Sequence, residues 1–531
     1  MGDSVDYVDS ISAYNEGRYL QFWEFGHLFW RPLGWLSYRL FSPLTNLVFP
    51  GDERAKITVT LMAINWLAGL ACVLILRSLM SRVCKREWIA DVATIGFVFS
   101  AAFLNYGQTG SAYVPGIALI LAAILVLVRN AERAVPSVKN ALIAGLLLSA
   151  ATCLWIPFVL LIPAALAAPL LLVRFDTLQI KLLFWTCVSL AVCTAISYLI
   201  VIGIINIRSM AQLEVWVTAA SHGMDRMRGV PRMVFGFANS LIDLSGDGSV
   251  FKRYLKHDPL NPVSAASLIR SSLWKLIICY IVLGLMLISL LRSPRRWQFI
   301  TLLVLDLLPT VIFALFIFEA GDTSRYISTL PLLFLVFGYS LSNEKSIPWI
   351  RYLSVAFIAA LIFTNYSAMS YRKLQARESR NSARVNELLP LLNQNSLVLV
   401  SHLQDDLANF TRDYLFNPIN RNGNLHYGAI LAINTSQVDH WKRDAADGVY
   451  RVWGKGGDVW LAKRLLAPRP RVDWNWVEGD DPRVSWTDLY NYFSRFEVGQ
   501  SVGGDDGFVL LLPSEHNKEL LNQDASPSVN K

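Results

Sequence analysis

The sequence predicts a mostly α-helical protein that crosses a membrane about ten times and ends in a small α/β domain. The first observation is composition: 54% of the residues are hydrophobic and the mean hydropathy is +0.39. The second is a series of long apolar runs between residues 57 and 369. The third is a change after residue 370 to polar sequence with short apolar runs. Together they indicate an integral membrane protein with a soluble C-terminal part.

Each predicted span is an apolar run close to the length that the hydrocarbon core of a bilayer requires. The fourth and fifth runs are short and meet at residues 155–157, so they form either a tight hairpin or one kinked unit. The ten runs are 57–79, 88–105, 112–128, 140–154, 157–173, 181–206, 271–291, 298–318, 326–341 and 349–369.

The distribution of basic residues predicts the orientation. Alternate short connections, such as 77–87, 129–139 and 292–296, are rich in Lys and Arg, whereas residues 105–112 and 319–325 hold one basic residue, Arg325. The positive-inside rule therefore places the basic set in the cytoplasm. The net charge of +8 then reflects the basic cytoplasmic loops, which set the membrane topology. We therefore expect no nucleic-acid partner.

All the long polar segments then share the extracytoplasmic face. We expect an N-terminal loop with amphipathic helices at 1–56, a transmembrane bundle at 57–370 with an outer loop at 206–270, and an extracytoplasmic α/β domain at 371–514. Residues 515–531 are expected to be a disordered tail. Within the domain, strands are expected at 396–400, 428–433, 449–453 and 508–512.

The most polar part of the N-terminal loop reads GDSVDYVDS at residues 2–10. Asp3 and Asp6 are the candidate catalytic residues, because a carboxylate at a membrane mouth can act as a general base or bind a divalent metal ion. The alternative is a solvated tail in which the carboxylates only cap a helix.

Further candidates for substrate binding follow in GHLFWRPLG at 26–34 and GDTSRYISTLP at 321–331. His27 and Arg31 are four residues apart and share a helical face, and an arginine can hold a phosphate through two hydrogen bonds. The alternative is an interfacial helix anchored at headgroup depth. Asp322 and Arg325 end a loop beside a span, where they either form a local salt bridge or place a guanidinium beside a phosphate.

Two more features are candidates for function. Arg226 and Arg228 lie in the arginine-rich stretch 221–232, which suits a lipid-linked phosphate or nonspecific anionic lipid. Asp306 lies near the middle of an apolar run, where a carboxylate is costly and is either functional or paired to a neighbouring helix.

These motifs resemble the GT-C superfamily of polytopic glycosyltransferases, which includes relatives of protein O-mannosyltransferases and aminoarabinose transferases. The resemblance covers residues 1–370 and implies transfer of a sugar from a polyprenyl-phosphate carrier to an extracytoplasmic acceptor in the bacterial inner membrane, in cell-envelope synthesis. It implies that Asp3, then Asp6, matches the catalytic aspartate of the first outer loop and that Arg325 matches a basic residue near the donor phosphate. Family members have a span before that aspartate, so we expect either that the native protein begins upstream or that this chain is inactive. The sequence DSVD in place of DxD leaves the use of a metal ion open.

The resemblance implies an inverting transfer of a hexosyl or pentosyl group to a glycan, lipid or protein. Two other functions remain open: a transporter or flippase for a lipid-linked glycan, and a non-catalytic assembly protein of envelope glycan synthesis. A transporter predicts functional polar residues throughout the spans, whereas polar residues here gather at one mouth.

Overall fold

The computed structural model divides the chain into two compact units, which are described separately. The bundle unit comprises residues 1–244 and 274–370, and the sheet unit comprises residues 245–273 and 371–531. The structure describes residues 2–15, 22–51, 53–173, 175–219, 229–244, 250, 253–254, 262–271, 273–317, 320–343, 347–370, 373–393, 395–401, 407, 411, 429–432, 441–471, 474 and 485–524. Side chains are left out for residues 2–6, 9, 270, 370, 373–379 and 429–432 within these ranges.

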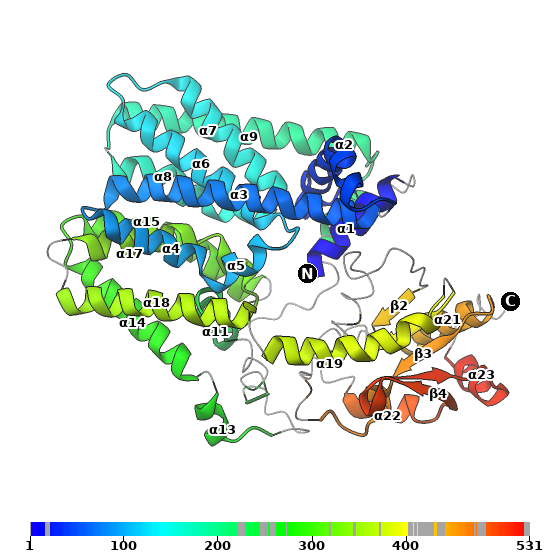
Figure 1. The fold of residues 1–531 in the computed structure, drawn as a ribbon. Helices are drawn as coiled ribbons and strands as arrows, with labels where there is room; N and C mark the ends of the chain where they lie inside the picture. Colours follow the sequence, from blue (N-terminus) through cyan, green and yellow to red (C-terminus); the bar gives the residue numbers. More distant parts are fainter. Residues whose placement is uncertain are drawn as a thin grey trace. The chain divides into compact units, whose positions relative to one another are not determined.

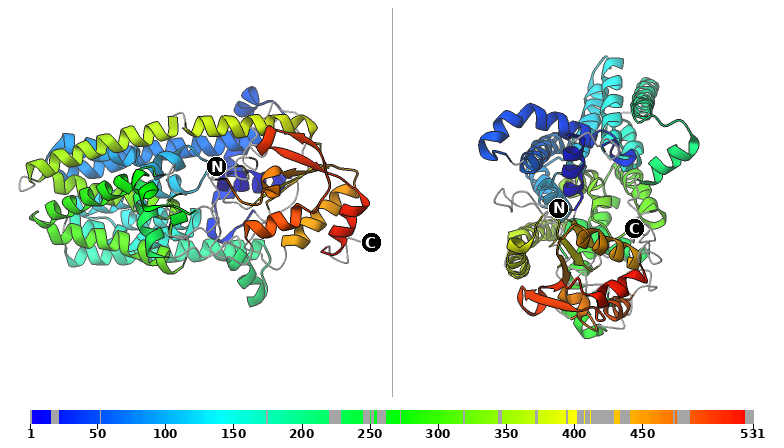
Figure 2. Two further views of the ribbon diagram at one scale, coloured as in Figure 1. Left: turned by 90° about the horizontal axis from the view of Figure 1, so that it is seen from below. Right: turned by 90° about the vertical axis from the view of Figure 1, so that its right-hand side faces the viewer.

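Every predicted apolar run is helical in the bundle unit, and the long helices run along one common direction (Figures 1 and 2). Six helices of the described residues are long and apolar enough to span a membrane: α3 (Glu53–Val83), α6 (Tyr113–Glu132), α9 (Thr177–Ile204), α14 (Leu273–Leu291), α15 (Arg296–Phe316) and α18 (Pro348–Ser370).

The remaining runs are shorter or broken. Helices α4 (Glu87–Val98) and α5 (Ala101–Gly107) are apolar and meet at a bend of 60°, which makes them either one broken span or a re-entrant loop. The other three are α7 (Val138–Leu154), α17 (Leu330–Ser342), and η2 (Ile156–Leu161) continued by α8 (Ile162–Leu172). Because Trp155 is extended between α7 and η2, the fourth and fifth runs form two helices with a sharp break.

Small residues allow the bundle helices to approach closely. A side chain on Gly145 of α7 would overlap the backbone of α9, and one on Gly116 of α6 would overlap the ring of Phe158. Close backbone approach of this kind is the usual source of helix association in a bilayer, where hydrophobic burial between helices contributes little.

The N-terminal loop folds into α1 (Gly2–Asn15), η1 (Phe25–His27) and α2 (Trp30–Val48), with α1 packed against α2 and α3. Helix α2 is amphipathic. Trp30, Gly34 and Tyr38 on one side are buried, whereas the leucines at 36, 40, 44 and 47 are exposed. Because the exposed residues recur every three or four positions, they form an apolar stripe along α2.

Three further short helices complete the bundle unit: α10 (Met210–Ala219), α11 (Val230–Leu241) and α16 (Ser324–Ile327). Helix α11 packs against the turn before α16, where Gly236 faces the backbone of Ala320 and Gly321. In the same turn the Tyr326 hydroxyl donates a hydrogen bond to the Ala320 carbonyl at 2.7 Å.

The sheet unit is built on a five-stranded mixed sheet with strand order β2-β1-β3-β5-β4. Strand β1 (Leu397–Val400) is parallel to β2 (Ala429–Ala432) and β3 (Val459–Ala462), whereas β5 (Phe508–Leu511) is antiparallel to β3 and β4 (Val498–Val502). The other elements are α13 (Ala265–Arg270), α19 (Lys373–Leu388), η3 (Leu389–Leu391), α21 (Trp441–Trp453), η5 (Lys463–Leu466), α22 (Trp486–Phe493), η6 (Gly504–Asp506) and α23 (Glu515–Asn522).

The strand residues alternate between two cores. Leu397 and Leu399 pack with residues of α21, α22 and α23 on one face of the sheet. Val398 and Val400 pack with residues of α19 on the other. This period of two fixes the register, because a shift by one residue would exchange the two faces.

Two expectations for the C-terminal region are wrong, and two strands were not expected. Residues 449–453 end helix α21 and form no strand, because Trp441, Ala445 and Val449 recur every four residues and bury one helical face. Strands β3 and β4 were not expected. Residues 515–524, assigned to the disordered tail, include helix α23, whose Asn517 and Leu521 are buried.

A buried ion-pair cluster around Asp506 holds several segments of the sheet unit together. Asp506 accepts hydrogen bonds from Arg464 at 3.1 Å and from the Trp474 indole at 3.1 Å, and it pairs with Arg384 at 2.9 Å. Arg253 donates to the Trp474 carbonyl at 2.8 Å. Residues 245–270, the second part of the outer loop expected at 206–270, therefore belong to the sheet unit.

Candidate functional site

The candidate site is built around helix α1, which carries Asp3 and Asp6 in its first turns. Tyr7, Val8 and Ile11 of this helix are buried in the main core of the bundle unit. At its end, Asn15 accepts hydrogen bonds from Trp35 at 2.8 Å and Arg39 at 3.1 Å. Helix α1 is thus docked from Tyr7 to Asn15. The side chains of Asp3 and Asp6 themselves lie outside the described residues.

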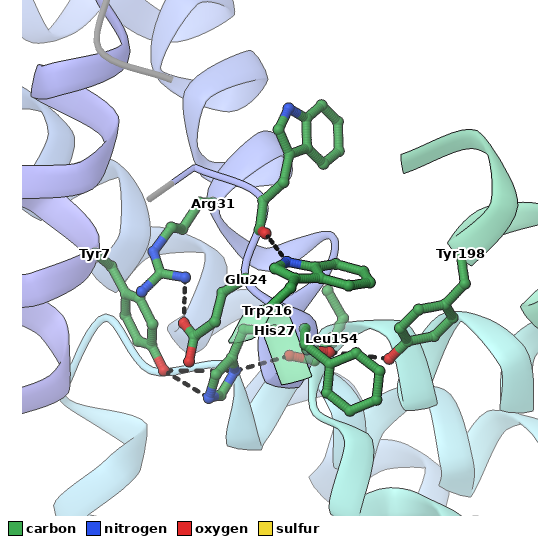
Figure 3. A network of polar contacts seen from close by, with 9 residues as sticks. Tyr7, Glu24, His27, Arg31, Leu154, Tyr198 and Trp216 are labelled. Carbon is green, nitrogen blue, oxygen red and sulfur yellow. Dashed lines mark hydrogen bonds and ion pairs between the residues drawn. The ribbon is translucent and has the colours of Figure 1, made fainter. Parts of the chain in front are cut away.

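Tyr7 and His27 connect α1 to the end of α7 (Figure 3). The Tyr7 hydroxyl lies 3.2 Å from Nε2 of His27, and Nδ1 of His27 lies 3.0 Å from the Leu154 carbonyl. Because a carbonyl can only accept, Nδ1 carries a proton, and a neutral His27 ring therefore accepts the Tyr7 hydrogen on Nε2. The two bonds fix both the ring orientation and the tautomer.

Arg31 forms a buried ion pair with Glu24, a residue that the sequence analysis did not select. Its guanidinium lies 5.2 Å from the centre of the Tyr7 ring, so its charge also meets the face of an aromatic ring. Nε of Arg31 is buried without a hydrogen bond to any described residue. Glu24 could have been suspected from the sequence, because it is a lone carboxylate inside the aromatic stretch 22–30.

The segment before His27 is held from the other side by α9 and α10 (Figure 3). The Trp216 indole donates to the Trp23 carbonyl at 2.7 Å, and the Tyr198 hydroxyl donates to the Phe25 carbonyl at 3.0 Å. Nothing in the sequence signals these contacts, since they join residues more than 170 positions apart.

Asp322 and Arg325 lie in the turn that begins α16. Asp322 accepts hydrogen bonds from the Ser324 amide at 2.9 Å, from the Ser324 hydroxyl at 2.5 Å and from the Tyr106 hydroxyl at 3.2 Å. Its separation from Arg325 is 4.0 Å, and the Arg325 guanidinium lies 5.8 Å from the centre of the Trp155 ring.

The structure brings the two sets of candidates to one place, the junction between α7 and η2. His27 binds the carbonyl of Leu154, and Arg325 stacks on the ring of the next residue, Trp155. Arg226 and Arg228 lie outside the described residues. Asp306 is buried in α15, and neither of its carboxylate oxygens bonds to a described residue.

The described residues contain no metal site. Across the described ranges, no three His, Cys, Asp or Glu side chains are close enough together to hold a metal ion. Asp3 and Asp6 are outside that comparison, so their use of a divalent cation stays a prediction.

Comparison with known proteins identifies the fold. No protein-family model matches the chain, and no curated protein matches its sequence. The structure of ArnT from Cupriavidus metallidurans bound to undecaprenyl phosphate matches with a TM-score of 0.52 at 9% sequence identity, covering 96% of this chain and 94% of ArnT. The apo structure of ArnT from the same organism matches with a TM-score of 0.42 at 12% identity, covering 99% of this chain and 94% of ArnT. The chain therefore has the fold of ArnT over nearly its whole length, which confirms the fold implied by the resemblance to GT-C proteins.

Proposed function

We propose that the protein is a membrane glycosyltransferase that moves a sugar from a polyprenyl-phosphate carrier to an extracytoplasmic acceptor. The observation that carries the proposal is the ArnT fold across 96% of the chain, since the matching ArnT structure is bound to undecaprenyl phosphate. The position of Arg325 over Trp155 at the α7–η2 junction supports it, because a phosphate leaving group is stabilised by a cationic hydrogen-bond donor.

In the proposed reaction, the Asp3 carboxylate takes the proton of an acceptor hydroxyl. The freed oxygen attacks the anomeric carbon from the face opposite the carrier. The bond from that carbon to the phosphate oxygen breaks, and the polyprenyl phosphate leaves with the electron pair, so the configuration inverts. Asp3 precedes Tyr7 by four residues in α1, which places both on one side of that helix. Asp6 is the second candidate for the base.

Arginine stabilises the negative charge that develops on the leaving phosphate. Arg325 is the first candidate, because its side chain is largely buried and stacked on Trp155, which gives it a fixed position. Arg226 and Arg228 are proposed to contact the same phosphate from the preceding loop. His27 and Arg31 orient the donor, and a phosphate at Arg31 has to compete with Glu24.

The test compares surface glycans by mass spectrometry in a deletion strain complemented with the full gene, carrying the wild-type sequence, Asp3→Asn or Asp9→Asn. Asp9→Asn is the matched control, because it makes the same change in the same helix. We expect the deletion to lose one sugar, and wild type and Asp9→Asn to restore it, while Asp3→Asn does not. Full restoration by Asp3→Asn at normal protein level removes Asp3 as the base. If the deletion changes no glycan, the glycosyl-transfer proposal fails.

A transporter for a lipid-linked glycan is the second candidate, and Asp306 is the observation that favours it. Carboxylates buried inside membrane spans commonly mark ion or substrate pathways. In the same experiment, loss of the sugar with Asp306→Asn and its retention with Asp3→Asn supports the transporter.

A further inference from the structure

The connection from α9 to α10 forms an elbow over the segment that leads to His27. Helix α9 ends at Ile204, and Asn206 takes a left-handed conformation with φ of 60°, which asparagine tolerates better than most residues. The chain then turns into α10, where Met210 and Val215 are exposed. Trp216 of this helix contacts the segment before His27.

Two donors from this elbow bind two carbonyls of one short segment (Figure 3). Trp216 donates to Trp23 and Tyr198 donates to Phe25. The Phe25 ring lies 5.3 Å from the Trp216 ring and 5.3 Å from the Tyr198 ring. Hydrogen bonds and ring packing therefore act at the same point.

The backbone between the two carbonyls determines the direction of the Glu24 side chain. Glu24 is extended, with φ of −83° and ψ of 136°. In an extended chain successive side chains point to opposite sides. Trp216 of α10 and Tyr198 of α9 bind the carbonyls on either side of Glu24. The Glu24 side chain points to the other side, where it meets Arg31, which lies over the Tyr7 ring.

We propose that the α9–α10 elbow is a clamp that positions helix α1, with Trp216 and Tyr198 as its positioning residues. The contacts form one continuous path: Trp216 holds Trp23, the extended backbone directs Glu24 to Arg31, and Arg31 lies over the ring of Tyr7 in α1. The catalytic consequence rests on the proposed function, because it requires Asp3 of α1 to be the base.

The first test is hydrogen–deuterium exchange of the purified full-length protein. Trp216→Phe keeps an aromatic ring but removes the N–H donor together with part of the ring surface, a loss that the control below shares. The matched control is Trp185→Phe, which changes a half-exposed indole on α9. We expect Trp216→Phe to raise the exchange rate of amides in residues 22–31 about fivefold or more, as loss of one buried hydrogen bond predicts, and to raise exchange in α1. Equal exchange in the two variants overturns the clamp.

The second test separates binding from turnover. Undecaprenyl phosphate is the probe, and its affinity is measured by native mass spectrometry beside sugar transfer in the complemented deletion strain. We expect Trp216→Phe and Tyr198→Phe to keep the wild-type affinity within about twofold while transfer falls about fivefold or more. Equal loss of binding and transfer means general damage and overturns the positioning role. If wild type neither binds the probe nor transfers sugar, the proposed function fails, while the exchange result still decides whether the clamp exists.

Discussion

The Gly236→Ala substitution is expected to displace the turn that carries Asp322 and Arg325. A Cβ atom at position 236 would lie 2.7 Å from the Ala320 carbonyl oxygen and 2.9 Å from the Gly321 carbonyl carbon. Both neighbours are backbone atoms, so no side chain can rotate away. An ordinary contact begins at 3.4 Å, so α11 and the turn must separate by about 0.7 Å.

The expected magnitude follows from this displacement. Overpacking of a well-filled site costs about 1–3 kcal/mol of stability. A misplacement of about 1 Å at a reacting centre can lower a rate about 100-fold. We therefore expect sugar transfer to fall more than about tenfold, since Arg325 moves with the turn.

Gly284→Ala is the matched control. Gly284 is also helical, in α14, and a Cβ there would meet no atom within 4 Å. Both substitutions gain the same helix propensity, about 0.5–1 kcal/mol, so the difference between them isolates the overlap.

The assay is the surface-glycan measurement in the complemented deletion strain, normalised to the amount of protein in the membrane, together with the thermal unfolding midpoint of each purified variant. If Gly236→Ala matches Gly284→Ala in both measurements, the turn does not depend on α11 as argued, and the structural basis for placing Arg325 is refuted.

Three further predictions concern the sheet unit and α1. Asp506→Ala removes the buried carboxylate that pairs with Arg384 and Arg464, so pulse proteolysis of the full-length protein should show a loss of about 3 kcal/mol. The exposed neighbour in Asp505→Ala should change little. Burial, and secondarily the charge of Asp524, raises the pKa of Tyr492, so the folded state favours the neutral phenol. The stability that this phenol contributes is fully present below a pH of about 10 and is lost as the pH rises further. Alkaline unfolding followed by phenolate absorbance should accordingly move to higher pH in Tyr492→Phe. A double-mutant cycle of Tyr7→Phe and His27→Ala should give a coupling energy of about 1 kcal/mol in thermal unfolding, whereas simple additivity would contradict the bond between them.

The membrane helices could be predicted from the sequence because their signal is local. A run of about 20 apolar residues has few other stable structures in a bilayer, and every run is helical in the structure, although some are divided between two helical elements. The sheet unit was harder, since residues 449–453 are short and apolar enough for either a strand or a helix end. The helix is favoured because it buries Val449 on the same face as Trp441 and Ala445.

The arrangement of the site depends on contacts that no local pattern contains. His27 meets Leu154 across 127 positions, and Tyr198 meets Phe25 across 173. Glu24 stands out in the sequence as a lone carboxylate, but no spacing connects it to a partner, and its importance follows from the ion pair with Arg31. Motif chemistry selected His27 and Arg325, but their common place beside Leu154 and Trp155 is a product of helix packing.

The discontinuous sheet unit has a consequence for biogenesis. Arg253 and its acceptor on Trp474 are 221 positions apart, with α14, α15, α17 and α18 between them. At ordinary rates of synthesis, about 5–20 residues per second, the early segment waits about 10–45 s for its partner. The sheet unit can include that segment only when the intervening helices have inserted so that both segments emerge on the same side of the membrane. Folding of this small unit therefore depends on the correct membrane topology of the bundle. If one of the intervening helices failed to insert, Arg253 and Trp474 would lie on opposite sides of the membrane.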